Sequence, residues 1–140
     1  MFISEKELKN QFWTYYKRRK GIVAYQFENS MREGNCDLLT LEVFQDKYQI
    51  NAFEFKLNDI KKVFLQAEAN LPFVNKSWVV IPMEKEEVIN NKYLNYLKEK
   101  QFIGVIGVEA SGRWNIIYQP RIQQEFKINQ EIIKFIVTGK

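Results

Sequence analysis

The segment Ala52–Leu57 constrains the fold more than any other part of the chain, because it combines apolar and charged residues in one β-rich run. In a strand, successive side chains point to opposite faces, so Phe53 and Phe55 share one face. Glu54 and Lys56 share the other. The phenylalanine face must belong to a core. Charges in so apolar a strand cost desolvation free energy unless they are paired or bind a metal ion, so a polar site is expected here.

A hairpin would add a third polar residue to this strand. The strand-like runs Asp37–Phe44 and Gln49–Leu57 are separated by four residues, which is hairpin spacing. If the hairpin closes about residues 46 and 47, Asp37 faces Lys56. Asp37 and Glu54 are then diagonal neighbours on one face, with Cβ atoms about 5–7 Å apart. Two carboxylates at that spacing can share a divalent cation, and a neighbouring ammonium can orient or deprotonate a metal-bound water.

The rest of the chain alternates helix-like and strand-like patterns. Hydrophobic periodicity predicts helices over residues 4–19, 58 or 59 to about 70, 86–100 and 129–138. Short β-rich runs predict strands over 22–27, 37–44, 49–57, 78–81, 103–109 and 114–118, with a loop over 28–35. A hairpin followed by a strand–helix–strand crossover indicates an α/β fold with a mixed central sheet flanked by helices. Because no repeat or linker divides the 140 residues, we expect one domain over 1–140.

The composition excludes several kinds of chemistry. The chain has no histidine, which rules out serine–histidine and cysteine–histidine catalysis and histidine-ligated zinc. Its one cysteine, Cys36, rules out an internal disulfide. Carboxylates, lysine, hydroxyls or a hard, oxygen-bound metal ion remain. The net charge of +4 is compatible with a polyanionic partner. With no long apolar run and no signal-peptide pattern, a cytoplasmic location away from membranes is the default expectation.

The order of these features resembles a known family. Asp37, then Glu54-Phe55-Lys56 on the next strand, then a helix and the apolar strand Trp78–Ile81, is similar to the restriction-endonuclease-like αβββαβ core of PD-(D/E)XK nucleases. The resemblance covers roughly residues 4–82. Within it, the sequence is similar to small uncharacterised members from bacteria and mobile elements. Cys36 stands where the family pattern has proline. The resemblance implies a Mg²⁺-dependent nuclease, an endonuclease or exonuclease that hydrolyses DNA with one or two metal ions. Mn²⁺ is expected to substitute, and many relatives are homodimers.

The resemblance also implies roles for individual residues. Asp37 and Glu54 would be the metal ligands, joined by the backbone carbonyl of Phe55. Lys56 would position the attacking water. Many members, archaeal Holliday-junction resolvases among them, carry a glutamate on the first helix. Glu5 is the choice for that role here.

Two further positions are less determined. Glu7 is the alternative to Glu5, although Glu7 also fits a capping box with Ser4. Some branches of the family place a glutamine on the helix after the Glu-x-Lys motif, four residues before a tyrosine. Gln66 fits that glutamine, but Asn70 stands where the tyrosine would be.

Basic residues near these elements are candidates for DNA contact. Arg18 and Arg19 lie in the basic end of the first helix, where cations also complement the helix dipole. Lys61 and Lys62 lie in the first turn of the second helix, where the dipole disfavours cations, so phosphate contact explains them better. Arg32 lies in the loop that leads to Asp37.

Two alternatives compete with a nuclease. The first is a non-catalytic nucleic-acid-binding or assembly module on the same fold. The second is a small α/β protein without a nucleic-acid role, in which Glu54 and Lys56 form an ion pair worth about 0–1 kcal/mol.

Overall fold

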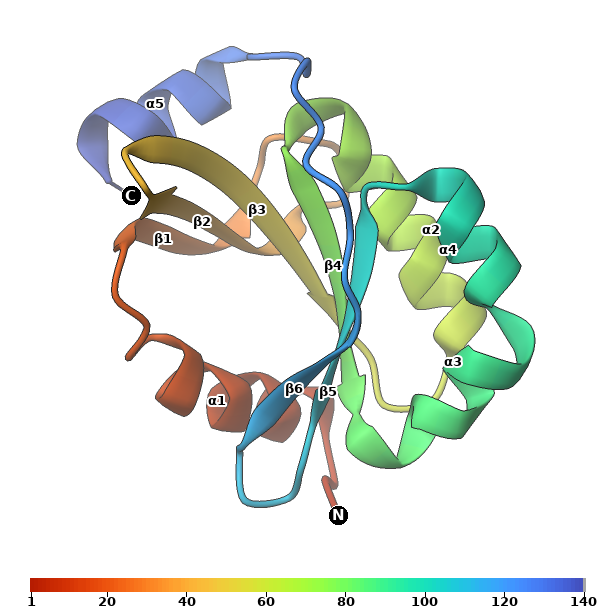
Figure 1. Ribbon diagram of the computed structural model, residues 1–140. Helices are drawn as coiled ribbons and strands as arrows, with labels where there is room; N and C mark the ends of the chain where they lie inside the picture. Colours follow the sequence, from red (N-terminus) through yellow and green to blue (C-terminus); the bar gives the residue numbers. More distant parts are fainter. Residues whose placement is uncertain (140) are drawn as a thin grey trace.

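The computed structural model describes residues 1–139 and consists of one six-stranded sheet with helices on both faces (Figure 1). The strands lie in the order β1-β2-β3-β4-β5-β6. Strand β4 runs parallel to β3 and β5, and the other neighbours are antiparallel. The elements are α1 (Glu5–Tyr16), β1 (Ile22–Asn29), β2 (Cys36–Phe44), β3 (Lys47–Phe55), α2 (Ile60–Asn70), β4 (Lys76–Pro82), α3 (Glu86–Lys92), α4 (Leu94–Lys100), β5 (Ile103–Val108), β6 (Trp114–Tyr118) and α5 (Gln130–Thr138). The expected α/β fold with a mixed sheet is confirmed.

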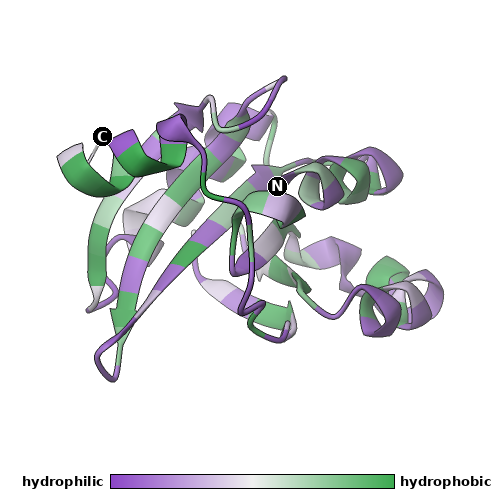
Figure 2. Ribbon diagram, turned by 90° about the horizontal axis from the view of Figure 1, so that it is seen from above, coloured by the Kyte–Doolittle hydropathy of each residue, from purple (hydrophilic) through white to green (hydrophobic). Residues whose placement is uncertain are grey.

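The two faces of the sheet carry separate cores. Helix α1 covers one face, where Phe12 packs against Phe53 and Phe55 as the alternation of β3 requires. Helices α2, α3 and α4 cover the other face over β4 and β5, and α5 covers it over β1 to β3 (Figure 1). Broad hydrophobic bands mark α5, the helix that ends at the C-terminus, in Figure 2. Among residues 1–139, no helix is long and apolar enough to cross a membrane.

The turn between β2 and β3 lies one residue earlier than expected, which shifts the partner of every paired residue by two. Its turn is Gln45-Asp46, both with positive φ (51° and 64°), and Phe44 pairs with Lys47. The predicted closure about residues 46 and 47 is therefore wrong, and Asp37 does not face Lys56. Two-residue turns of this type favour Asn-Gly or Asp-Gly, so Gln-Asp carries no turn signal. Because the shift is two residues, Asp37 and Glu54 keep their predicted common face.

The predicted third helix over 86–100 is two helices. Tyr93 separates α3 from α4 with φ −120° and ψ −1°, outside the helical region. Its ring packs 4.8 Å from the ring of Phe64 on α2. We infer that this aromatic contact, a tertiary interaction, overrides the local helical periodicity. Strand β1 also extends to Asn29, two residues beyond the predicted strand.

Candidate active site

Asp37 and Glu54 meet where β2 begins and β3 ends. The paired register stops at Leu38 opposite Phe53, so Asp37 and Glu54 follow as immediate neighbours. The backbone N–H of Asp37 donates to Glu54 Oε2 at 3.2 Å, and the N–H of Phe55 donates to Asp37 Oδ2 at 3.0 Å. The two side chains thus replace ladder hydrogen bonds at the end of the hairpin. Each carboxylate is held in place by one of its oxygens.

Glu54 is almost completely buried, with 1% of its surface exposed. Besides the Asp37 N–H, its Oε2 accepts hydrogen bonds from Asn70 Nδ2 at 2.9 Å and from Arg32 Nη2 at 3.3 Å. Arg32 Nε also donates to Asn70 Oδ1 at 2.5 Å, which closes a triangle of three side chains. A buried carboxylate requires such donors, because losing water without replacement would cost several kcal/mol.

The protonation of Glu54 reflects this burial. Desolvation raises the pKa of Glu54 from 4.5 to about 7, and the nearby charge of Asp37 adds to the rise. The hydrogen bonds from Asn70 and Asp37 and the charge of Arg32 act in the opposite direction. The carboxyl is therefore half ionised near neutral pH, and any cation that approaches it would favour the ionised form.

The loop between β1 and β2 delivers Arg32 to Glu54. The buried side chain of Asn29 accepts from the N–H of Met31 at 2.8 Å, and Asn129 donates to the Met31 carbonyl at 2.7 Å. Gly34 follows with φ +85°, where any Cβ would lie 3.1 Å from Arg32 Nη1. A glycine at this position lets the loop turn back without displacing the guanidinium.

Lys56 lies just after the end of β3 and contacts α1. Its Nζ is 3.3 Å from Glu5 Oε2 and 3.5 Å from Glu5 Oε1. Within residues 1–139, Lys56 forms no ion pair with Glu54. The Glu54–Lys56 ion pair expected for a small α/β protein without a nucleic-acid role is therefore wrong. The side chain of Glu7 instead accepts from the N–H of Ile3, and the N–H of Glu7 donates to the Ser4 hydroxyl oxygen, as in a helix cap. Of the two glutamates, Glu5 is the one at the site.

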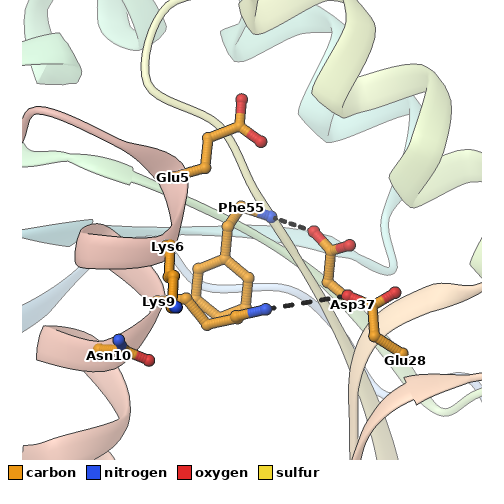
Figure 3. A pocket seen from close by; sticks show the side chains of 7 residues that line it. All are labelled: Glu5, Lys6, Lys9, Asn10, Glu28, Asp37 and Phe55. Atoms are coloured by element: carbon orange, nitrogen blue, oxygen red, sulfur yellow. Dashed lines mark hydrogen bonds and ion pairs between the residues drawn. The ribbon is translucent and has the colours of Figure 1, made fainter.

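A shallow pocket of about 380 Å³ opens beside these residues (Figure 3). Its walls come from α1, from the ends of β1 and β3 and from the start of β2. Its lining residues are Glu5, Lys6, Lys9, Asn10, Glu28, Asp37 and Phe55. In Figure 3, Glu28 faces Lys9, whose Nζ is 3.8 Å from Glu28 Oε1, and the Asp37 carboxylate faces the backbone nitrogen of Phe55. Glu54 does not line the pocket, so Asp37 is the member of the Asp37–Glu54 pair that is open to it.

Helix α2 contributes two polar residues to the same region. Asn70 is completely buried and bonds Glu54. Gln66 lies four residues earlier, on the same helix face, and its Oε1 is buried without a hydrogen-bond partner within residues 1–139. The sequence prediction treated Asn70 as a departure from the family pattern and missed its contact. The position of Asn70 on the apolar side of α2 marks it as a polar residue that faces the sheet, but this pattern does not identify Glu54 as its partner.

The predicted DNA-contact residues differ in their surroundings. Lys61 and Lys62 are exposed on α2. The guanidinium of Arg18 lies 4.8 Å from the Tyr15 ring, and that of Arg19 lies near Tyr16. Arg32 is turned inward on Glu54, so phosphate contact by Arg32 would require it to leave that carboxylate. These contacts stay predictions.

The donor set at the site suits a hard divalent cation. Asp37 Oδ1 and Glu54 Oε1 accept no hydrogen bond from residues 1–139, so each carboxylate keeps one oxygen without a protein donor. Carboxylate and carbonyl oxygens are the ligands that Mg²⁺ prefers. No group of three or more Cys, Asp or Glu side chains gathers as a metal cluster in the described chain. A cation here would therefore need water or substrate oxygens to complete its coordination.

Comparison with protein-family models, curated proteins and solved structures finds no match for this chain.

Proposed function

We propose that this chain is a Mg²⁺-dependent nuclease that hydrolyses DNA phosphodiester bonds, with Mn²⁺ as a substitute, and that it belongs to the PD-(D/E)XK type. The observation that carries the proposal is the pairing of two carboxylates, Asp37 and Glu54, at the end of a hairpin with a lysine and a second acid beside them. Burying carboxylates in an otherwise apolar strand costs stability, and such perturbed groups cluster at functional sites.

The fold supports the same assignment. The first six helices and strands in sequence are α1, β1, β2, β3, α2 and β4, and β4 lies parallel to β3. This is the order of the αβββαβ core that the resemblance implies. The proposal is also supported by Asp37 at the start of β2 and Glu54 near the end of β3, because the resemblance implies two acids on these successive strands.

The residues divide the proposed work among them. Asp37 and Glu54 would hold the cation, with the Phe55 carbonyl as a further ligand. When bound, the cation would supply charge neutralisation on the phosphate and a lower pKa for a water molecule. Lys56 would orient the attacking water by donating hydrogen bonds, and Glu5 holds the Lys56 ammonium at 3.3 Å. Gln66 would offer its unpaired Oε1 as an additional acceptor at the edge of the site.

One observation favours the non-catalytic alternative. Arg32 lies 3.3 Å from Glu54 Oε2 and already supplies a positive charge to that buried carboxylate. An arginine in this role can replace a metal ion in a site that has lost its catalytic function. In that case the chain would bind DNA through its basic residues without hydrolysis and without a metal requirement.

A cleavage assay separates the two candidates. Supercoiled, linear, single-stranded and branched DNA would be incubated with the full chain and Mg²⁺ or Mn²⁺. We expect metal-dependent cleavage that Glu54→Gln and Lys56→Gln each reduce at least about 100-fold. The exposed Lys134→Gln on α5 is the matched control. Cleavage unaffected by either site variant would overturn the proposal, and DNA binding without any cleavage would favour the module.

A further inference from the structure

A second pocket, at the opposite ends of β2 and β3 from the candidate active site, contains buried polar groups without partners. It holds about 350 Å³ between the last turn of α1 and the sheet. We call it the basal pocket and define it by Arg19, Lys20, Phe44, Asn51, Lys76 and Trp78. These residues come from β2, β3, β4 and the chain that follows α1. None of them belongs to the proposed nuclease centre.

Two uncharged side chains in the basal pocket lack hydrogen bonds. Asn51 and Trp78 are each 4% exposed, and neither Asn51 Oδ1 nor Trp78 Nε1 has a partner within residues 1–139. A buried polar atom without a partner costs about 1–3 kcal/mol, and native proteins contain few of them. Both residues line the same pocket, although the two atoms themselves are buried. A ligand with a matching donor and acceptor would satisfy both atoms if the two side chains turn toward it.

The ammonium of Lys76 forms no ion pair with the described residues. Among the described residues no carboxylate lies within 4.0 Å of its Nζ, whose closest aromatic contact is the Trp78 ring at 5.9 Å. Burial lowers the pKa of Lys76, which Glu42 offsets in part and Arg19 lowers further. A half-buried cation is stabilised when an anion approaches it.

Glu42, the one acid among the residues that line the pocket, already has hydrogen-bond partners and a nearby cation. Glu42 accepts from the Tyr16 hydroxyl at 2.8 Å and from the Thr40 hydroxyl at 2.6 Å, and Arg19 Nη1 lies 3.7 Å from it. With Glu42 balanced by Arg19, Lys20 and Lys76 leave the pocket positively charged. The electrostatics therefore select an anionic ligand.

An aromatic surface borders the same cations. The ring of Phe44 lines the pocket and the residue is 66% exposed, which is unusual for a phenylalanine. A flat apolar group could stack on it, and stacking of a base on an aromatic ring contributes about 1–3 kcal/mol. The volume of about 350 Å³ is within the usual range for small-molecule pockets.

We propose that the basal pocket binds a nucleoside 5′-monophosphate, either free or as the terminal nucleotide of a strand. The phosphate pairs with Lys76 and Lys20, and the base lies on Phe44. Polar atoms of the base or sugar complete the hydrogen bonds of Asn51 Oδ1 and Trp78 Nε1. This inference does not rest on the proposed nuclease activity, because none of these residues contributes to that site.

Titration calorimetry on the full chain tests the proposal. The probes are the four common nucleoside 5′-monophosphates, adenosine, inorganic phosphate, and short oligonucleotides with and without a 5′-phosphate. A chelator keeps divalent ions away from Asp37 and Glu54. We expect at least one monophosphate, or a 5′-phosphorylated strand, to bind with a Kd below about 1 mM. Adenosine and inorganic phosphate should bind at least about tenfold more weakly, since each supplies only part of the contacts.

Variants separate this site from adventitious binding. Lys76→Gln should weaken binding at least about tenfold and Lys76→Arg should restore it, whereas Trp78→Phe should cost several-fold by losing one donor. The exposed Lys134→Gln is the control and should bind like the wild type. Absence of binding by every phosphorylated probe at about 10 mM would overturn the proposal. So would equal affinity for inorganic phosphate, or equal affinity of the wild type and Lys76→Gln.

Discussion

Buried polar groups along β3 differ in whether the protein supplies their partners. At the carboxyl end of β3, Glu54 receives three N–H donors on one oxygen, including the guanidinium of Arg32. At the middle of β3, Asn51 and the neighbouring Trp78 keep buried polar atoms without partners among the described residues, and no carboxylate of those residues lies within 4.0 Å of Lys76 Nζ. At the first end the buried Glu54 has protein donors and a cation without any ligand, although one oxygen of each carboxylate accepts no hydrogen bond from the described residues. At the basal pocket, Asn51 Oδ1 and Trp78 Nε1 have no partner among those residues.

This difference separates two kinds of binding. A cation at the first end must compete with Arg32 for Glu54, so its affinity depends on how readily the guanidinium withdraws. An anion in the basal pocket displaces nothing from the protein and only fills missing contacts. Ligand-induced stabilisation should therefore be direct at the basal pocket and coupled to a side-chain rearrangement at the carboxylate pair.

The largest effect is expected from a substitution that removes a carboxylate of the Asp37–Glu54 pair and leaves the basal pocket intact. Asp37→Asn removes one of two carboxylates, so DNA cleavage should fall at least about 100-fold. Nucleotide binding in the basal pocket should not change. Steady-state cleavage rates and calorimetry on the same preparation measure both. Glu99→Gln, an exposed acid on α4, is the control. A loss of cleavage shared by Glu99→Gln would show that the effect is not specific to the site.

The next largest effect concerns the positive charge that Arg32 supplies to Glu54. Arg32→Met removes the cation from a carboxylate that is 1% exposed, so we expect a loss of about 3–5 kcal/mol in the free energy of unfolding at pH 8 with a chelator present. Mg²⁺ should return part of that loss, because the freed carboxylate can then bind it. Urea unfolding curves provide the measurement. Arg113→Met, with an exposed side chain, should change stability by less than about 0.5 kcal/mol.

The outcome with Mg²⁺ decides between the two candidate functions. If Arg32→Met gains Mg²⁺ affinity, the carboxylate pair is a metal site at which Arg32 competes with the cation for Glu54. If the variant is destabilised and Mg²⁺ restores nothing, Arg32 is a permanent substitute for the cation. The second outcome would contradict the nuclease proposal.

The pH dependence gives a smaller effect at the same end. Folding raises the pKa of Glu54 from 4.5 to about 7, so the folded chain holds this proton more tightly than the unfolded chain. The associated stability is complete below about pH 4.5 and is lost as the pH rises through 7. Relative to Glu54→Gln, the wild type should lose about 3 kcal/mol between pH 4.5 and 8, at about 1.4 kcal/mol per pKa unit. Urea unfolding at several pH values with a chelator measures this. A difference that is independent of pH would contradict the raised pKa.

How much of this could be predicted from the sequence depends on the range of the interactions. The alternation of Phe53, Glu54 and Phe55 correctly predicted which side chains are core. The register of the hairpin could not be predicted, because Gln45-Asp46 lacks the residues that mark a two-residue turn. An even shift kept Asp37 and Glu54 together nonetheless, since side-chain direction has a period of two.

Long-range partners were beyond a sequence argument. Arg32 and Asn70 reach Glu54 from a loop and from α2, and only the packed fold brings them together. The resemblance supplied a glutamate on the first helix, and Glu5 was preferred for that role because Glu7 also fits a capping box with Ser4. The basal pocket did leave one signal in the sequence. Asn51 shares the strand face of Phe53, so its alternation placed a polar side chain in the aromatic core.

The smallest expected effect tests the other half of the comparison. Lys76→Met removes a half-buried cation without an anionic partner, so the free energy of unfolding should stay the same or rise, by no more than about 1 kcal/mol. This is the opposite sign from Arg32→Met, although both changes replace a cation by methionine. Urea unfolding of the two variants side by side measures the contrast. Lys134→Met, which is exposed on α5, sets the baseline for losing a surface charge. A clear loss of stability in Lys76→Met would mean that Lys76 already has a compensating partner in the ligand-free chain, and the two regions along β3 would then be alike.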